Sequence, residues 1–450
     1  MKMIPVTFPD YLKPDLHAKR NWLLVAFLNL VIVAFLGLLL RWMFVGAIKE
    51  INYKFLLHAH SHVALLGWLY TAVFVALLVT FLPQESRNQK TYTWQFWLSQ
   101  GAVLGMLFSF PVQGYAAVSI TFSTAHMLLS YWFIYQFLRD AGKAKINMGE
   151  HRLSLKFVKA ALFFLAISSL GPWVMGPIMA LGHIGSEMYF NAIYFYLHFQ
   201  YNGWFTFSVL GLLFWLLEYY QVSFNSKLAV LFFRLMFWSC IPAYLLSVLW
   251  TKPDANIYLV SGVAAFVQVV ALIILLVMLV PLHRQILILF GRWSRRLFIL
   301  AAVAFLFKTG MQFASAFPYM AELAFRLRLF IIGYLHLVLI GFISIFLFAF
   351  FTQQGWLSFK HGISRWGMGL FLLGFISSES MLFVQGLLFW LMAGAIPFYN
   401  NFLFGVSILL PVGILLFFLG QLSGSRNNEA KVRDEIRLQR ECAEKKCVKV

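Results

Sequence analysis

The sequence predicts an all-α membrane protein built as a bundle of about twelve transmembrane helices. Hydrophobic residues make up 62% of the chain and charged residues only 11%, whereas a soluble domain is about half apolar and about a quarter charged. The mean hydropathy is +0.81. A helix needs about 20 predominantly apolar residues to cross a bilayer, and runs of that length follow one another without room for a soluble domain between them.

Each predicted helix is an apolar run bounded by polar or charged residues. In order, the runs cover residues 22–44, 55–82, 94–112, 116–138, 156–180, 190–219, 228–250, 257–282, 297–317, 329–351, 366–391 and 401–419. Together they predict a transmembrane bundle over residues 1–422, followed by a charged tail over residues 423–450.

The orientation of the bundle follows from its basic loops. Loops after even-numbered helices contain Arg87 and Lys90; Arg139, Lys143, Lys145 and Arg152; Lys227; Arg284, Arg292, Arg295 and Arg296; and Lys360 and Arg365. Because cytoplasmic loops carry the excess of Lys and Arg, both termini and the tail are predicted to be cytoplasmic. The net charge of +19 is interpreted as this topology signal, and nucleic acid is not expected as a partner.

One short phrase occurs twice, far apart. It reads His62-Val-Ala-Leu-Leu-Gly-Trp68 and later His336-Leu-Val-Leu-Ile-Gly-Phe342. Histidine inside a bilayer is costly and needs a partner or a metal. Both helices run inward, and each histidine lies roughly 10 Å below the outer end of its helix at 1.5 Å per residue. Two histidines at one depth are what a six-coordinate haem iron requires.

Three histidines of the second predicted helix compete for that role. His58 and His62 are four residues apart and share a helix face, whereas His60 points roughly the opposite way. One haem cannot use all three. The structural alternative is that some of them only bond carbonyl groups or neighbouring helices.

A third polar group lies in the sixth predicted helix, which also enters from outside. His198, Gln200 and Asn202 form a strip within an aromatic segment, and polar side chains there need internal partners. The strip is either an interhelical hydrogen-bond cluster or the wall of a second site.

Other ionisable side chains lie within or beside predicted helices. Lys308 and Glu379 are predicted to form a buried pair, with a proton route through Lys308, Thr309 and Gln312 as the alternative. Arg326 and Arg328 break the charge bias of the outer loops, so we expect anionic partners such as haem propionates or lipid phosphates. The spacing of Cys240, Cys442 and Cys447 favours neither covalent haem nor a disulfide framework.

These features resemble the large catalytic subunit of the heme-copper oxidase superfamily over nearly the whole chain. The phrase around His336 looks most like the C-type cytochrome c oxidase branch and the related nitric oxide reductases. The resemblance implies one low-spin haem b with His336 as one axial ligand. Gapless comparison with the family's second helix favours His60 as the other ligand, whereas the internal repeat favours His62, and we lean to His62. It also implies a bacterial inner membrane and respiratory subunits or an electron-donor cytochrome as partners.

The departures from the family pattern concern the oxygen-reducing centre. Tyr334 stands where the family has the histidine that holds the high-spin haem, so a second haem is left open. His198 matches one copper ligand, but the seventh predicted helix contains no histidine. A lone imidazole does not hold copper, so copper is not expected and His198 is a remnant ligand at most.

The sequence therefore predicts a b-type haem protein that transfers electrons or senses redox state or gases, and leaves open whether it is an enzyme. One alternative is a working terminal oxidase or nitric oxide reductase with unusual ligands. A second is a transporter or metal permease without haem, with His58, His62, His126 and His198 along its path. A third is a purely structural membrane subunit.

Overall fold

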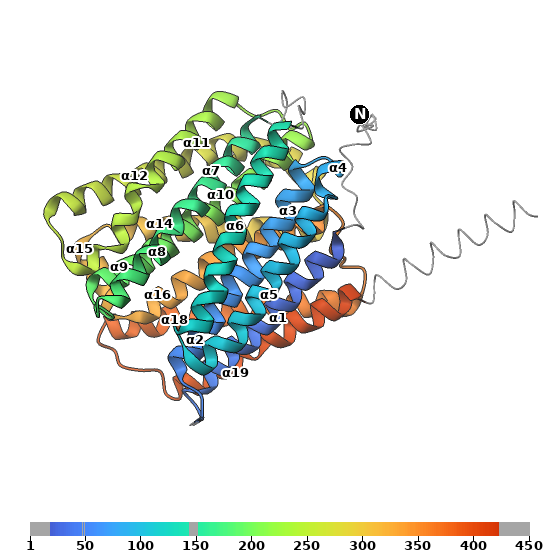
Figure 1. The fold of residues 1–450 in the computed structure, drawn as a ribbon. Coiled ribbons are helices and arrows are strands. Elements are labelled where there is room, and N and C mark those ends of the chain that lie inside the picture. Colours follow the sequence, from blue (N-terminus) through green and yellow to red (C-terminus); the bar gives the residue numbers. More distant parts are fainter. Residues whose placement is uncertain (1–18, 47, 49, 144–151, 423–450) are drawn as a thin grey trace, which may run out of the picture.

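The computed structural model describes residues 19–46, 48, 50–143 and 152–422, and these residues form helices and connecting loops without a β-strand. The helices lie side by side in one bundle (Figure 1). The predicted charged tail, residues 423–450, lies outside the described residues.

The bundle is built from helical rods, several of which contain more than one helical segment. The first rods are α1 (Arg20–Trp42), the continuous rod α2 (Tyr53–His62), η2 (Val63–Tyr70) and α3 (Thr71–Phe81), then the short α4 (Gln84–Arg87), α5 (Lys90–Gln113) and α6 (Ala117–Lys143). The middle rods are α7 (Arg152–Ser168) with α8 (Leu170–Ala180), then α9 (Glu187–His198), η3 (Phe199–Phe205) and α10 (Thr206–Tyr219), then α11 (Ser226–Cys240) with η4 (Pro242–Ser247) and η5 (Leu249–Thr251), and α12 (Ala255–Leu279) with η6 (Val280–Leu282) and α13 (His283–Leu289). The last rods are α14 (Arg292–Ala314), the short α15 (Pro318–Arg326), then α16 (Arg328–His336), η7 (Leu337–Ser344) and α17 (Ile345–Gln353), α18 (Gly362–Trp390) and α19 (Tyr399–Ser407), which continues to Leu422.

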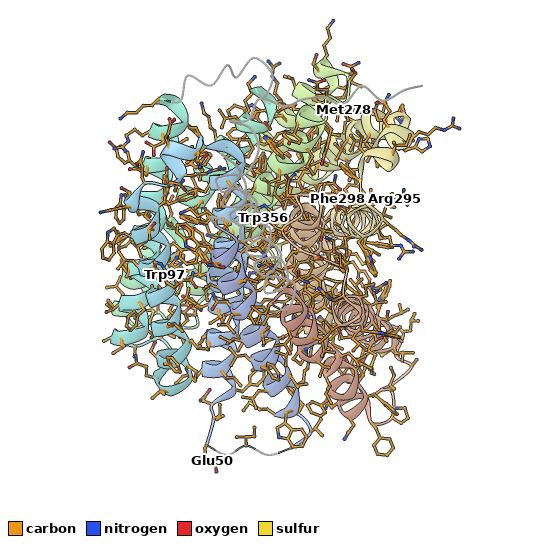
Figure 2. The ribbon with its side chains drawn as sticks, turned by 90° about the vertical axis from the view of Figure 1, so that its right-hand side faces the viewer. Glu50, Trp97, Met278, Arg295, Phe298 and Trp356 are labelled. Atoms are coloured by element: carbon orange, nitrogen blue, oxygen red, sulfur yellow. The ribbon has the colours of Figure 1, made fainter. Side chains whose placement is uncertain are left out.

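The chain is an integral membrane protein. Within the described residues, nine helices are long and apolar enough to cross a bilayer. Large apolar side chains cover the outer surface of the bundle; Trp97 on α5, for example, is 52% exposed (Figure 2). Such a surface is stable only against lipid, because a soluble monomer rarely exposes wide apolar patches. The rod of α11 is interrupted because Pro242 lacks the backbone N–H that would continue the α-helix.

Three rods contain a π-helix that begins directly after a histidine. These histidines are His62, His198 and His336, and the π-helices are η2, η3 and η7. In each case the phrase is histidine, four residues, glycine and an aromatic residue, so the repeat seen twice in the sequence has a third copy at His198–Trp204. π-Helical segments are rare and occur frequently at functional sites.

A hydroxyl group closes each π-helix at its carboxyl end. Thr71, Thr206 and Ser344 each donate to the carbonyl five residues earlier, on Leu66, Tyr201 and Leu339 respectively. The hydroxyls satisfy carbonyl groups that the wider helical turn would leave unpaired. The π-helices also meet one another, since Trp68 Nε1 donates to Ser344 Oγ at 2.8 Å and η3 packs against η7.

Glycines set the close packing of α18 against α16 and η7. An added Cβ at Gly333 would lie 2.9 Å from the Phe383 ring, and one at Gly341 would lie 2.8 Å from the Phe375 ring. The reciprocal contact places the Phe330 ring over Gly386 at 3.0 Å. This packing brings the middle of α18, with Glu379, against the end of α16.

The two ends of the described bundle lie side by side. The Arg20 guanidinium, at the start of α1, donates to the carbonyl of Gln421 at 2.7 Å, and Figure 1 shows both ends of the described chain at the same end of the bundle.

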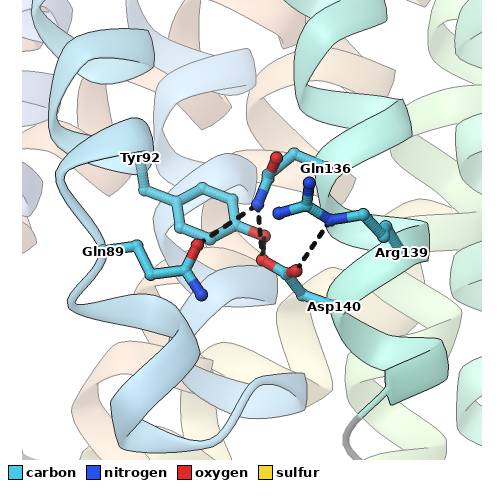
Figure 3. Close-up of polar contacts among 5 residues, drawn as sticks. All are labelled: Gln89, Tyr92, Gln136, Arg139 and Asp140. Atoms are coloured by element: carbon cyan, nitrogen blue, oxygen red, sulfur yellow. Dashed lines mark hydrogen bonds and ion pairs between the residues drawn. The ribbon is translucent and has the colours of Figure 1, made fainter.

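A buried polar cluster joins α5 to α6 near their loop ends. The Asp140 carboxylate accepts from Tyr92 Oη at 2.9 Å and from Gln136 Nε2 at 2.8 Å (Figure 3). Arg139 contacts the other carboxylate oxygen at 3.3 Å.

Candidate functional site

His60 faces helix α1 and is held by it. Its Nδ1 lies 3.1 Å from the carbonyl oxygen of Val33. Because a carbonyl oxygen only accepts, Nδ1 carries the proton and Nε2 presents a lone pair. Among the described residues, none forms a hydrogen bond with that Nε2. Gly37 makes room for the ring, since a Cβ there would lie 3.0 Å from His60 Cε1.

His336, at the end of α16, lies beside an acidic side chain. Its Nδ1 lies 3.3 Å from Oε1 of Glu379, a residue that is only 7% exposed. At this distance the contact is an ion-pair contact, and neither Glu379 carboxylate oxygen forms a hydrogen bond with the described residues. His60 and His336 lie close enough to interact electrostatically. His60 therefore has one nitrogen held by a hydrogen bond, His336 has its Nδ1 beside a carboxylate, and Nε2 of each ring is without a hydrogen bond to the described residues.

His62 has a different environment on the opposite face of α2. Its Nδ1 bonds the carbonyl of His58 at 2.8 Å, and its Nε2 lies 3.3 Å from the hydroxyl of Tyr115. The ring stacks on Phe110 of α5 at 4.3 Å. Both ring nitrogens of His62 are engaged, so these contacts favour His60 over His62 as the partner of His336.

The opposed directions of His60 and His62 follow from helix geometry. Two residues in an α-helix are separated by about 200° of rotation at 3.6 residues per turn. The buried Asn29 on α1 fixes the rotation of this rod, because its Nδ2 donates to Gly67 O at 3.0 Å and to Gln100 Oε1 at 2.8 Å. That contact keeps His60 toward α1 and His62 toward α5.

Three residues beside His60 and His336 were not recognised as site residues from the sequence. Gly37 accommodates the His60 ring, Glu379 anchors His336, and Arg41 interacts electrostatically with both His60 and Glu379. Arg41 ends the first helix on the side where basic residues are scarce. This departure from the charge bias of the loops is the sequence feature that could have indicated a buried acidic or histidine partner for Arg41.

The predicted Lys308–Glu379 pair is wrong. Glu379 faces His336 and Arg41, whereas Lys308 lies beside Cys240 and His198. The Lys308 amine also lies 6.0 Å from the centre of the Phe305 ring. The two ionisable side chains belong to separate sites because α14 and α18 present them to different neighbours.

His198 has both ring nitrogens engaged. Its Nε2 donates to the carbonyl of Cys240 at 2.9 Å, and its Nδ1 accepts from Asn202 Nδ2 at 3.1 Å. The ring is 1% exposed. These contacts agree with the interhelical hydrogen-bond cluster that was one reading of the polar strip. Gln200 makes a separate interhelical bond, from its Nε2 to Ser168 Oγ at 2.8 Å.

Tyr334 and His198 line one cavity of about 220 Å³. It lies between the rods of α9–η3, η4 and α14, with α15 and α16 closing its other sides. Tyr334 contacts Tyr201 with ring centres 6.1 Å apart. His60 and His336 are not among the residues that line this cavity.

Arg326 lies at the end of α15, and Arg328 begins α16. Arg326 pairs with Glu322 at 2.6 Å, and Lys252 reaches the same carboxylate at 3.3 Å. Glu322 is therefore the anionic partner of Arg326. These two cations lower the pKa of the Glu322 carboxyl. Arg328 interacts electrostatically with Tyr194, beside the cavity.

The described residues contain no cluster of three or more His, Cys, Asp or Glu side chains arranged to hold a metal ion. A haem needs only two protein ligands, so His60 and His336 fit that donor set. No protein-family model matches the chain, and no curated protein is significantly similar to it.

Proposed function

We propose that the chain is a membrane b-type haem protein in which His60 and His336 are the axial ligands of one low-spin haem. The observation that carries the proposal is the matched state of the two imidazoles. Nδ1 of His60 bonds to the Val33 carbonyl, Nδ1 of His336 lies 3.3 Å from the Glu379 carboxylate, and neither Nε2 has a hydrogen bond to the described residues. Metal-bound histidines almost always donate their other nitrogen to a carbonyl or carboxylate in this way.

The anchors also give the two ligands different strengths. A carbonyl oxygen fixes the tautomer and the orientation of His60, whereas the Glu379 carboxylate additionally makes the His336 imidazole more basic. The haem would supply one-electron transfer, and its reduction potential depends on ligation, burial and nearby charge. Glu379 and Arg41 would place opposite charges beside it.

The hydrogen bonds of His198 support a site without copper. Copper needs several ligands in a defined geometry, and binding to His198 would require the loss of its bond to Cys240 or to Asn202. Tyr334 lies in the cavity beside Tyr201 and not at the His60–His336 site. We therefore propose electron transfer, or sensing of redox state, rather than copper-dependent oxygen reduction.

The proposed relationship is to the large subunit of heme-copper oxidases, with twelve transmembrane helices and both termini cytoplasmic. Besides the nine helices that meet the criteria for a span, α5, α9–α10 and α11 lie within the bundle. The contact between Arg20 and Gln421 supports an even number of crossings, because it joins the two ends of the bundle. We propose a bacterial inner membrane as the location and a cytochrome or respiratory subunits as partners.

A reduced-minus-oxidised spectrum of the purified chain, with haem quantified as its pyridine complex, tests the proposal. We expect one b-type haem per chain whose reduced spectrum is unchanged by carbon monoxide. Two haems with a component that responds to carbon monoxide would favour an oxidase or nitric oxide reductase. A preparation without a Soret band would favour the transporter or the structural subunit.

A further inference from the structure

The cavity beside Tyr334 is long, and its walls are mainly apolar. Its wall along α9 and η3 runs from Tyr194 to Asn202, which is about 12 Å at 1.5 Å per residue. Most of the other lining residues are aliphatic or aromatic. Asn202 Oδ1 and Gln312 Oε1 are buried by neighbouring atoms, so neither acceptor opens into the cavity. These walls suit a hydrocarbon group.

Helix α15 closes one side of the cavity with small side chains. Ala321 and Ala324 line the cavity from this helix. Phe325 of the same helix also lines it and stacks on Trp250, with ring centres 5.1 Å apart. Because Phe325 is 42% exposed, this edge of the cavity lies at the surface of the molecule. A ligand at this edge would contact both the cavity and the outer end of the bundle.

The surface beside this edge carries a cation without an anionic partner. Arg326 and Lys252 share the Glu322 carboxylate, at 2.6 Å and 3.3 Å. The exposed Arg328 side chain forms no ion pair or hydrogen bond with the described residues, although it interacts electrostatically with the lining residue Tyr194. Arg328 also begins α16, whose start has no side-chain cap, and helix amino termini favour anions. This edge therefore suits an anionic group.

The volume and the length of the cavity limit the apolar part of the ligand. A cavity of about 150 Å³ lined by apolar side chains holds one benzene molecule. A volume of about 220 Å³ therefore has room for about nine carbon atoms. A length of about 12 Å favours a chain over a compact molecule of the same volume.

We propose that this cavity binds an acyl chain of about eight to ten carbon atoms, whose anionic head group pairs with Arg328. A free fatty acid supplies such a head as a carboxylate, and an acidic phospholipid supplies it as a phosphate. The planar guanidinium of arginine matches both groups. The proposal does not rest on the haem proposal, because neither His60 nor His336 lines the cavity.

The test is calorimetric titration of the full chain, in micelles of an uncharged detergent, with decanoate. We expect saturable binding of one decanoate per chain. Arg328→Gln should weaken it about fivefold, since an exposed ion pair contributes up to about 1 kcal/mol. The matched control is Arg326→Gln, which removes a charge that Glu322 already pairs. Decanoate affinity should change less than about twofold in this control.

Two further measurements test the location and the role of the charge. Ala324→Phe places a ring in the cavity from α15 and should abolish saturable binding; Ala324→Val fills less of the space, should weaken binding, and serves if the first variant does not fold. Decanol has the chain without the charge, so Arg328→Gln should not change its affinity. Decanoate binding that both Ala324 variants leave intact would overturn the location.

Short-chain phospholipids distinguish the two sources of the head group. Didecanoyl phosphatidylglycerol is anionic, and didecanoyl phosphatidylcholine is its zwitterionic control. Binding of phosphatidylglycerol that Arg328→Gln weakens, without binding of decanoate, would assign the site to a membrane lipid. Equal affinity for the two phospholipids, equal weakening by the two arginine substitutions, or no saturable binding of either anionic ligand would overturn the proposal.

Discussion

Gly37→Ala should weaken haem binding through the position of His60. The added Cβ would lie 3.0 Å from Cε1 of the ring, whereas carbon atoms pack best at about 3.5–4.0 Å. The ring must therefore move by about 0.5 Å away from α1. The Nδ1–Val33 distance of 3.1 Å would then reach about 3.6 Å, beyond a hydrogen bond. Loss of an outer partner of a metal ligand costs about 10- to 100-fold in affinity.

The assay is haem occupancy of the purified variant at limiting haem, from the Soret absorbance per chain. Gly369→Ala is the matched control, because a Cβ at Gly369 on α18 meets nothing within 4 Å. Both substitutions raise helix propensity equally, so their difference isolates the contact with His60. If the two variants bind haem with the same affinity, Gly37 does not position the ligand and the reasoning is refuted.

Three further predictions concern the bundle itself. Tyr92→Phe should lower the free energy of unfolding by about 1.5–3 kcal/mol, because the buried Asp140 carboxylate loses a donor at 2.9 Å; denaturant titration measures it. Gly413→Ala should destabilise the α18–α19 contact by about 1–3 kcal/mol, because its Cβ would overlap the backbone nitrogen of Phe371; the same titration measures it. Burial and the nearby Arg87 lower the pKa of Lys19 to about 8. Between about pH 8 and pH 10.4, Lys19 is mostly protonated in the unfolded chain and mostly neutral in the folded chain. The free energy of unfolding should therefore increase as the pH rises through this range. Lys19→Met should reduce that increase, which thermal unfolding at several pH values measures.

Each of these predictions has a control in the same chain. Tyr135→Phe alters a tyrosine that is 65% exposed and should change stability little, and an equal loss in both tyrosine variants would contradict the first prediction. Gly405→Ala meets nothing within 4 Å, so a loss as large as that of Gly413→Ala would argue against close packing. A Lys19→Met variant with an unchanged pH profile would contradict the third.

Hydropathy predicted the helical bundle because long apolar runs have few other stable forms in a bilayer. It did not predict which residues face each other. The choice between His60 and His62 depends on the rotation of one rod, which Asn29 sets through contacts with two other segments. A sequence repeat cannot reveal that rotation, and it favoured His62.

The same limit explains the Lys308–Glu379 error and the missed repeat. Two opposite charges at similar depth were paired, but helix order in the bundle puts Glu379 beside His336 and Lys308 beside Cys240. The copy of the repeated phrase at His198 has polar residues where the others are aliphatic. The histidine and glycine spacing is the same in all three copies, and the shared π-helix after each histidine shows that they are equivalent.

The haem content of three alanine variants purified in parallel tests directly whether His60 and His336 are the axial ligands. His60→Ala and His336→Ala each remove a proposed axial ligand, whereas His62→Ala removes a ring of the same helix whose nitrogens are already engaged. We expect the first two variants to lose the low-spin spectrum and His62→Ala to keep it at one haem per chain. Loss of the spectrum in His62→Ala with its retention in His60→Ala would contradict the assignment of His60 as an axial ligand.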